Sequence, residues 1–206
     1  MSLKKATLLI VLILLLDQIS KFYIKTHLAL NESTLDYNWF KIIFVENEGM
    51  AWGTKMSDFI SAISDRTAKL ILTLFRIVAV IFISYWLVSS TKKKRATILI
   101  VAISLIFAGA LGNILDSVFY GMLFNDSHSQ VATFLPKDGG YDTLFHGKVV
   151  DMLHFPLWKG FLPEWIPFWG GDYFTFFEPV FNVADMAIST GIGMLIVFNK
   201  KAFSNH

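Results

Sequence analysis

The sequence contains no cysteine among its 206 residues. This absence excludes a disulfide-linked scaffold, a thiolate metal site and a cysteine nucleophile. Charged residues are scarce as well, at 17% of the chain against roughly 25% in an average soluble domain. Hydrophobic residues make up 54% and aromatic residues 16%. A soluble domain of this size would expose large apolar patches, so the composition predicts a protein embedded in a lipid bilayer and excludes a disordered chain.

Two common hydrolase signatures are also missing. The five histidines form no HExxH zinc-protease motif. No GxSxG nucleophile motif occurs, and Ser20 and Lys21 are adjacent in the sequence, so they do not face each other on a helix. We predict no metal or other cofactor and no nucleic-acid partner. Any catalytic chemistry is therefore left to carboxylates.

Four stretches are long and apolar enough to cross a bilayer core, which takes about 20 helical residues. They cover about residues 6–24, 70–88, 96–118 and 180–198. The predicted fold class is an all-α membrane protein with four transmembrane helices, forming a single polytopic domain over residues 1–206. No small-x-small cleavage site follows the first span, which we expect to remain as an anchor.

The orientation follows from clusters of basic residues. Lys4 and Lys5 precede the first span, residues 92–95 (KKKR) separate the second and third, and Lys200 and Lys201 follow the fourth. The positive-inside rule places all three clusters, and hence both termini, in the cytoplasm.

Segments 27–69 and 119–179 are then extracytoplasmic. Residues 38–46 (NWFKIIFVE) favour a strand, which predicts a small β-containing outer region. Residues 155–179 hold four of the five prolines and three of the six tryptophans, as expected of a loop at the membrane interface.

Polar residues interrupt all four spans at a similar depth. At about 1.5 Å per residue, they lie roughly 18 to 31 Å from the basic cluster of their own span, in the outer half of a core about 30 Å thick. Polar groups inside a span are costly and mark functional sites, so the spans predict a site that opens toward the outer leaflet. These residues are Asp17, Lys21, Arg76, Asn113, Asp116, Asn182 and Asp185.

The carboxylates differ in their neighbours. Asp17 and Lys21 are spaced i, i+4 and can pair on one helix, whereas Asp116 and Asp185 have no basic residue three or four positions away. Two carboxyl groups that share one proton can hydrolyse a peptide bond. Asp17 is a poor candidate because Lys21 would keep it ionised. The spacing leaves Asp116, Asp151 and Asp185 open as members of such a pair.

Five segments, in order along nearly the whole chain, resemble those of the lipoprotein signal peptidases, or signal peptidase II, which are aspartic proteases of bacterial inner membranes. The segments are 17–21 (DQISK), 47–53 (NEGMAWG), 109–116 (GALGNILD), 147–151 (GKVVD) and 181–185 (FNVAD).

The resemblance implies an endopeptidase that cleaves prolipoproteins just before a diacylglyceryl-modified Cys, in contact with membrane lipids and inhibited by globomycin-type peptides. By that resemblance Asp151 and Asp185 are the catalytic pair. The residues expected to shape the site and hold substrate are Asp17, Lys21, Asn47, Gly49, Asn113, Asp116 and Asn182.

Two features depart from the family pattern. Ser117 follows Asp116 where the family usually has Arg, and Arg76 is a candidate to replace that charge. The 34 positions between Asp151 and Asp185 exceed the spacing expected of the family, so segment 155–179 reads as an insertion. The main alternative function is a small proton-coupled transporter or channel. The polar groups argue against it, because they stop in the outer half of the spans and do not continue to the cytoplasmic face. The third interpretation is a non-catalytic scaffold protein.

Overall fold

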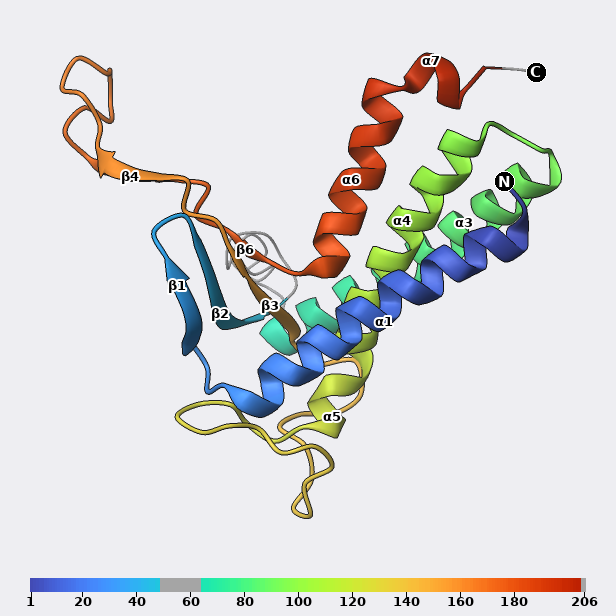
Figure 1. The fold of residues 1–206 in the computed structure, drawn as a ribbon. Helices are drawn as coiled ribbons and strands as arrows, with labels where there is room; N and C mark the ends of the chain where they lie inside the picture. Colours follow the sequence, from blue (N-terminus) through green and yellow to red (C-terminus); the bar gives the residue numbers. More distant parts are fainter. Residues whose placement is uncertain (49–63, 205–206) are drawn as a thin grey trace.

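The computed structural model of the protein describes residues 1–48 and 64–204. Its long helices are α1 (Leu3–His27), α3 (Asp65–Lys92), α4 (Thr97–Leu115) and α6 (Val183–Val197). A π-helical segment η2 (Asp116–Tyr120) and α5 (Gly121–Leu123) continue α4, and α7 (Asn199–Ala202) follows α6. The long helices pack side by side, and the β-strands gather near one end of α1 and α6 (Figure 1).

Three of these helices are long and apolar enough to cross a membrane: α1, α3 and the continuous segment 97–123. They contain the first three predicted spans. The fourth predicted span differs, because α6 has only 15 residues and begins at Val183. Val180 and Phe181 form strand β6 instead, and Asn182 caps the helix. The structure therefore supports three to four apolar helices and corrects the start of the last one.

Helices α4 and α6 approach closely because glycines line their contact. A Cβ at Gly109 would overlap the carbonyl oxygen of Ala184, and one at Gly191 would lie 2.7 Å from the carbonyl oxygen of Ala102. A Cβ at Gly112 would lie 2.6 Å from Asp17 Oδ2 on α1. Small residues let membrane helices meet backbone to backbone, and here they bring α1, α4 and α6 together at one level.

The β-containing part is built around a four-stranded antiparallel sheet in the order β1–β2–β3–β6. Its strands are β1 (Ser33–Tyr37), β2 (Phe40–Asn47), β3 (Val149–His154) and β6 (Val180–Phe181). Strand β2 matches the predicted strand at 38–46. Pairing of Val45 with Asp151 and of Leu153 with Phe181 places β3 in the middle, beside the start of α6.

Segment 155–179, expected to be a loop, contains a separate two-stranded hairpin of β4 (Trp158–Phe161) and β5 (Tyr173–Phe176). Trp158 pairs with Phe176 and Phe161 pairs with Tyr173, so aromatic cross-strand contacts hold it. The hairpin projects away from the helices and from the larger sheet (Figure 1).

Two hydrophobic clusters lie on either side of a polar layer. One, which includes Ile10, Ile100 and Ile103, joins the helices near the chain termini. The other, which includes Phe44, Phe124 and Val150, joins the C-terminal end of α1 to the sheet and to the segment after α5. Packing on both sides fixes the depth of the polar residues between them.

A buried lysine ties the second cluster together. Lys25 Nζ lies 2.6 Å from Glu46 Oε1 and donates to Ser127 Oγ at 3.0 Å. Its ammonium also lies 5.0 to 5.4 Å from the ring centroids of Phe44, Phe124 and Tyr141. Burial alone would raise the pKa of Glu46, but the charges of Lys25 and Lys148 outweigh burial and lower it. This cluster anchors β2 to α1.

Candidate active site

The first residue of the site caps helix α6. The Asn182 side chain accepts a hydrogen bond from the backbone N–H of Asp185 at 2.9 Å, and the Asp185 carboxylate accepts one from the backbone N–H of Asn182 at 3.2 Å. This reciprocal capping box fixes the Asp185 side chain at the N-terminus of the helix. Asn182 therefore lies just before the first residue of α6, not inside the helix as the sequence predicts.

The same asparagine reaches the second carboxylate. Asn182 Nδ2 donates to Asp151 Oδ1 at 2.7 Å, and Asn47 Nδ2 donates to Asp151 Oδ2 at 3.0 Å. Asp151 lies on β3 and is almost completely buried. Asn182 thus contacts both carboxylates, that of Asp151 through its side-chain amide and that of Asp185 through its backbone N–H, although the two acids are 34 positions apart in the sequence.

The environment of Asp151 favours its protonated form. Burial is the largest cause and the negative charge of Asp185 the second, and together they raise the pKa of Asp151 to about 7 despite the hydrogen bonds from Asn47 and Asn182. Because like charges close together resist joint ionisation, the pair is suited to hold a single proton near neutral pH.

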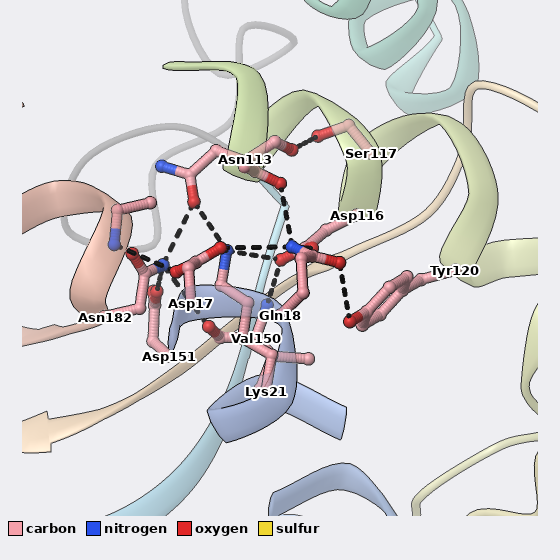
Figure 2. A network of polar contacts seen from close by, with 12 residues as sticks. Asp17, Gln18, Lys21, Asn113, Asp116, Ser117, Tyr120, Val150, Asp151 and Asn182 are labelled. Atoms are coloured by element: carbon pink, nitrogen blue, oxygen red, sulfur yellow. Dashed lines mark hydrogen bonds and ion pairs between the residues drawn. The ribbon is translucent and has the colours of Figure 1, made fainter. Parts of the chain in front are cut away.

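A buried network around a cation lies beside Asp151 and Asn182 (Figure 2). Lys21 Nζ lies 2.9 Å from Asp17 Oδ2 and 2.8 Å from Asp116 Oδ2, and donates to Asn113 Oδ1 at 2.9 Å. Lys21, Asp17 and Asp116 are each 0% exposed. The predicted Asp17–Lys21 pair is confirmed, and the same lysine is the partner that Asp116 lacks on its own helix.

Asn113 connects this network to the carboxylate pair. Its Nδ2 donates to Asp185 Oδ1 at 2.8 Å, while its Oδ1 accepts from Lys21 and, at 3.2 Å, from Asn182 Nδ2. Asn113 therefore touches both halves of the site. A change in its position would move hydrogen bonds in both.

Two carboxylates hold the backbone next to the pair. Asp17 Oδ1 accepts from the N–H of Ala184 at 2.9 Å, and Asp116 Oδ2 accepts from the N–H of Val150 at 3.2 Å. Ala184 and Val150 each immediately precede one of the paired carboxylates. Asp17 therefore positions the start of α6, and Asp116 positions β3.

Two residues that sequence reasoning missed or set aside also contribute. Gln18 Nε2 donates to Asp17, to the Gly112 carbonyl and to Asp116 at 2.9 to 3.2 Å, while its Oε1 accepts from Tyr120 Oη. A glutamine inside an apolar span was the available signal for it. Arg76, on α3, interacts electrostatically with both Asp185 and Asp151.

The remaining expectations have different outcomes. Ser117 Oγ donates to the carbonyl of Asn113 at 3.0 Å, so Lys21 supplies the cation at Asp116. Gly49 lies outside the described residues. Within residues 1–48 and 64–204, no group of three or more His, Asp or Glu side chains is placed to hold a metal ion.

Comparison with known proteins relates this arrangement to a peptidase family. Residues 9–200 match the family described as signal peptidase (SPase) II. The chain is 48% identical to a lipoprotein signal peptidase of Porphyromonas gingivalis over 195 residues, which cover 94% of this chain and 82% of the relative. It is 34% identical to a lipoprotein signal peptidase of Amoebophilus asiaticus, covering 93% of this chain and 75% of the relative.

The fold has a match among solved structures. A bacterial membrane enzyme superposes with a TM-score of 0.59 at 24% identity, covering 97% of this chain and 94% of that one. The described helices and the small β region therefore have the architecture of a membrane enzyme.

Proposed function

This chain belongs to the signal peptidase II family, and we propose that it removes signal peptides from prolipoproteins by using Asp151 and Asp185 to activate water. The supporting observation is the bridge through Asn182, which hydrogen-bonds both residues. The enzyme is a peptide-bond hydrolase, and the network around Lys21 serves to hold the two catalytic side chains in place.

The proposed mechanism starts with one carboxyl protonated and the other ionised. The raised pKa of Asp151 assigns the proton to it and leaves Asp185 as the base. Asp185 takes a proton from water while the oxygen attacks the scissile carbonyl, and Asp151 donates its proton to the carbonyl oxygen. The tetrahedral intermediate then collapses and its C–N bond breaks, as the proton held by Asp185 passes to the departing amine and a hydroxyl of the intermediate returns a proton to Asp151.

The surrounding residues have positioning roles in this proposal. Asp17 and Asp116 hold the backbone beside the two catalytic carboxylates, and Lys21 compensates their charge. Asn113 and Asn182 orient the carboxylates, and Asn47 holds Oδ2 of Asp151. Gly49 stays a sequence-based prediction as a position where the substrate chain passes closely.

The proposed substrate is a prolipoprotein whose Cys carries diacylglycerol, cleaved just before that Cys, and globomycin-type peptides are the expected inhibitors. The site lies where α6 meets the sheet, so a bond at this depth would have its acyl chains in the outer leaflet. We propose that residues 1–206 form one polytopic unit of the bacterial inner membrane, with α6 as a fourth span. The basic clusters at the termini and at 92–95 support cytoplasmic termini.

The proposal is tested by amide substitutions in purified protein. Asp151→Asn and Asp185→Asn should each abolish cleavage of a diacylglyceryl-modified prolipoprotein, because an amide neither accepts the water proton nor shares one with its partner. Since the two residues act as a unit, the double variant should lose no more than either single variant. Precursor and product are separated on a gel.

Asp116→Asn is the matched control. It makes the same isosteric change in a buried carboxylate of the same network, and it should lower activity less severely. Robust cleavage by either the Asp151 or the Asp185 variant would contradict the proposed pair. Loss of cleavage only at Asp116 would move the chemistry to the helical segment η2.

A pH profile gives an independent measurement. If Asp151 must be protonated, kcat/KM should fall as pH rises above about 7, the pKa to which burial and Asp185 raise it. An activity that stays constant to pH 9, about two units above that pKa, would remove Asp151 as the acid.

A further inference from the structure

The β4–β5 hairpin exposes aromatic side chains on both of its faces and at its tip. Trp158, Phe174 and Phe176 lie on one face, as the pairing of Trp158 with Phe176 requires, and Phe161 and Tyr173 lie on the other. All five are exposed. The connecting turn carries Trp165, which is 80% exposed, Phe168, which is 97% exposed, and Trp169.

No described part of the chain covers these rings, because the hairpin forms its own two-stranded sheet and projects away from the rest of the molecule (Figure 1). A two-stranded hairpin is marginally stable in water without a surface to pack on. Exposed aromatic clusters of this kind mark a surface of interaction. The hairpin therefore needs a partner outside the described chain.

The position of the hairpin indicates which partner that is. It leaves the sheet after β3 and returns through β6, whose last residue, Phe181, directly precedes the Asn182 cap of α6. The base of the hairpin thus lies where an apolar helix ends. Rings of Phe155, Phe177 and Phe181 pack against one another at 5.7 and 5.8 Å and make the aromatic surface continuous from the sheet to the hairpin.

The chemistry of the hairpin fits a lipid interface. Trp and Tyr concentrate where the headgroups meet the acyl chains, because their rings are apolar and their N–H and O–H groups are polar. The charges of the segment are mixed, with Lys159 against Glu164, Asp172 and Glu178. Such a net negative charge does not favour attraction to anionic lipids, so contact would come from ring burial.

We propose that the β4–β5 hairpin is a membrane-surface anchor whose tip, Trp165 to Trp169, inserts into the headgroup layer of the outer leaflet. The anchor extends the contact of the enzyme with lipid beyond its helices, on the side of the strand that carries Asp151. This proposal is independent of the cleavage reaction, so it can be tested by spectroscopy on the protein without substrate.

The experiment uses the full chain reconstituted into phosphatidylcholine vesicles, with or without lipid brominated near the headgroup end of its acyl chains. The fluorescence of the double variant Trp165→Phe/Trp169→Phe is subtracted from that of the unmodified protein, which isolates the two tip tryptophans. Brominated lipid should quench most of this difference signal, and aqueous iodide should quench little of it. Phosphatidylglycerol added to the vesicles should leave both results unchanged.

Three controls fix the interpretation. Trp86→Phe on α3 removes a tryptophan on an apolar helix, so it should reduce the lipid-quenchable fluorescence whether or not the hairpin tip is inserted. Phe168→Asp adds a charge to the tip and should shift the tip tryptophans toward iodide, whereas Phe168→Leu should not. Quenching of the tip by iodide alone would place it in water, and quenching by neither agent would place it in a protein interface; either result overturns the proposal.

Discussion

Lys21 and Lys25 lie one helical turn apart on α1, and both are buried, yet their surroundings differ. Lys21 contacts two carboxylates and an amide oxygen, whereas Lys25 contacts one glutamate, one hydroxyl and three aromatic rings. The partners of Lys21 reach the backbone beside Asp151 and Asp185. The partners of Lys25 reach the sheet and the segment after α5.

The difference shows that a buried charge serves either the site or the scaffold, according to what its partners hold. Both lysines are costly to bury and need compensation. The Lys21 cluster reaches the proposed catalytic pair through the hydrogen bond that Asn113 donates to Asp185. Activity and stability should therefore respond differently to changes at the two positions.

Among the buried lysines and their partners, the largest effect on activity is expected at Lys21. Lys21→Met removes the cation that lies between Asp17 and Asp116, which leaves two buried carboxylates without its charge and should displace the backbone they hold. Cleavage should fall by about 100-fold, the typical consequence of misplacing a catalytic group by about 1 Å. The measurement is initial-rate cleavage of a lipid-modified precursor, with folding checked by thermal unfolding.

Asp17→Asn should have a smaller effect. The amide keeps a hydrogen-bond acceptor for the Ala184 N–H but loses the ion pair with Lys21, so it should impair folding or substrate binding and leave residual turnover, about tenfold below the unmodified enzyme. Complete loss of turnover with fold and binding intact would instead give Asp17 a direct part in proton transfer.

Lys25→Met is the matched variant for Lys21→Met and should affect stability more than turnover. Loss of the ion pair to Glu46 should cost about 1–3 kcal/mol, while Lys148, 3.2 Å from Glu46, retains part of the compensation. We expect a lower Tm and cleavage within about threefold of normal. If Lys25→Met abolished cleavage in a folded protein, the division between site and scaffold would be wrong.

The same cluster should give a pH-dependent stability. Because Lys25 and Lys148 lower the pKa of Glu46 below its usual 4.5, this residue stabilises the fold above pH 4.5 and the stabilisation is lost as pH falls through the lowered value. The difference in Tm between the unmodified protein and Glu46→Gln should shrink as the solution is acidified below that pH. An unchanged difference would show that the charge of Glu46 is not what stabilises the sheet.

The smallest effect is expected at Arg76, a partly exposed cation. Its charge interacts with both proposed catalytic carboxylates, and a cation close to a carboxyl group favours the ionised form of that group. Arg76→Gln should move the alkaline limb of the pH–activity profile upward by about half a pH unit, and Arg76→Lys should restore its position. A pure change in KM with no shift would assign Arg76 to substrate contact.

The polar layer could be predicted from the sequence because burying a polar group in a membrane span is energetically costly, so such groups occur mainly where they have a function. Asp17, Lys21, Asn113 and Asp116 were placed at one depth by counting residues, and the structure brings them into contact. Counting residues along a span cannot place Asp151, because it lies on a strand outside the predicted spans. It was selected from the motif alone.

Other features depended on tertiary contacts that the sequence does not encode locally. Asn182 was assigned to the interior of a span, but it ends the helix because its side chain caps α6. The aromatic and proline-rich segment gave no alternating pattern, so its strands β4 and β5 were missed. The charge at Asp116 was sought on neighbouring residues, although its partner comes from α1.

Gly109 shows how far the site extends into residues that carry no chemistry. Its missing side chain is what allows α4 to lie against the carbonyl of Ala184. Any larger residue there would push the two helices apart, and Asn113 and Asp185 would lose the 2.8 Å hydrogen bond that spans the same contact. In a survey of random substitutions, position 109 should therefore be as intolerant as an aspartate of the site, and a single added methyl group would be enough to silence the enzyme.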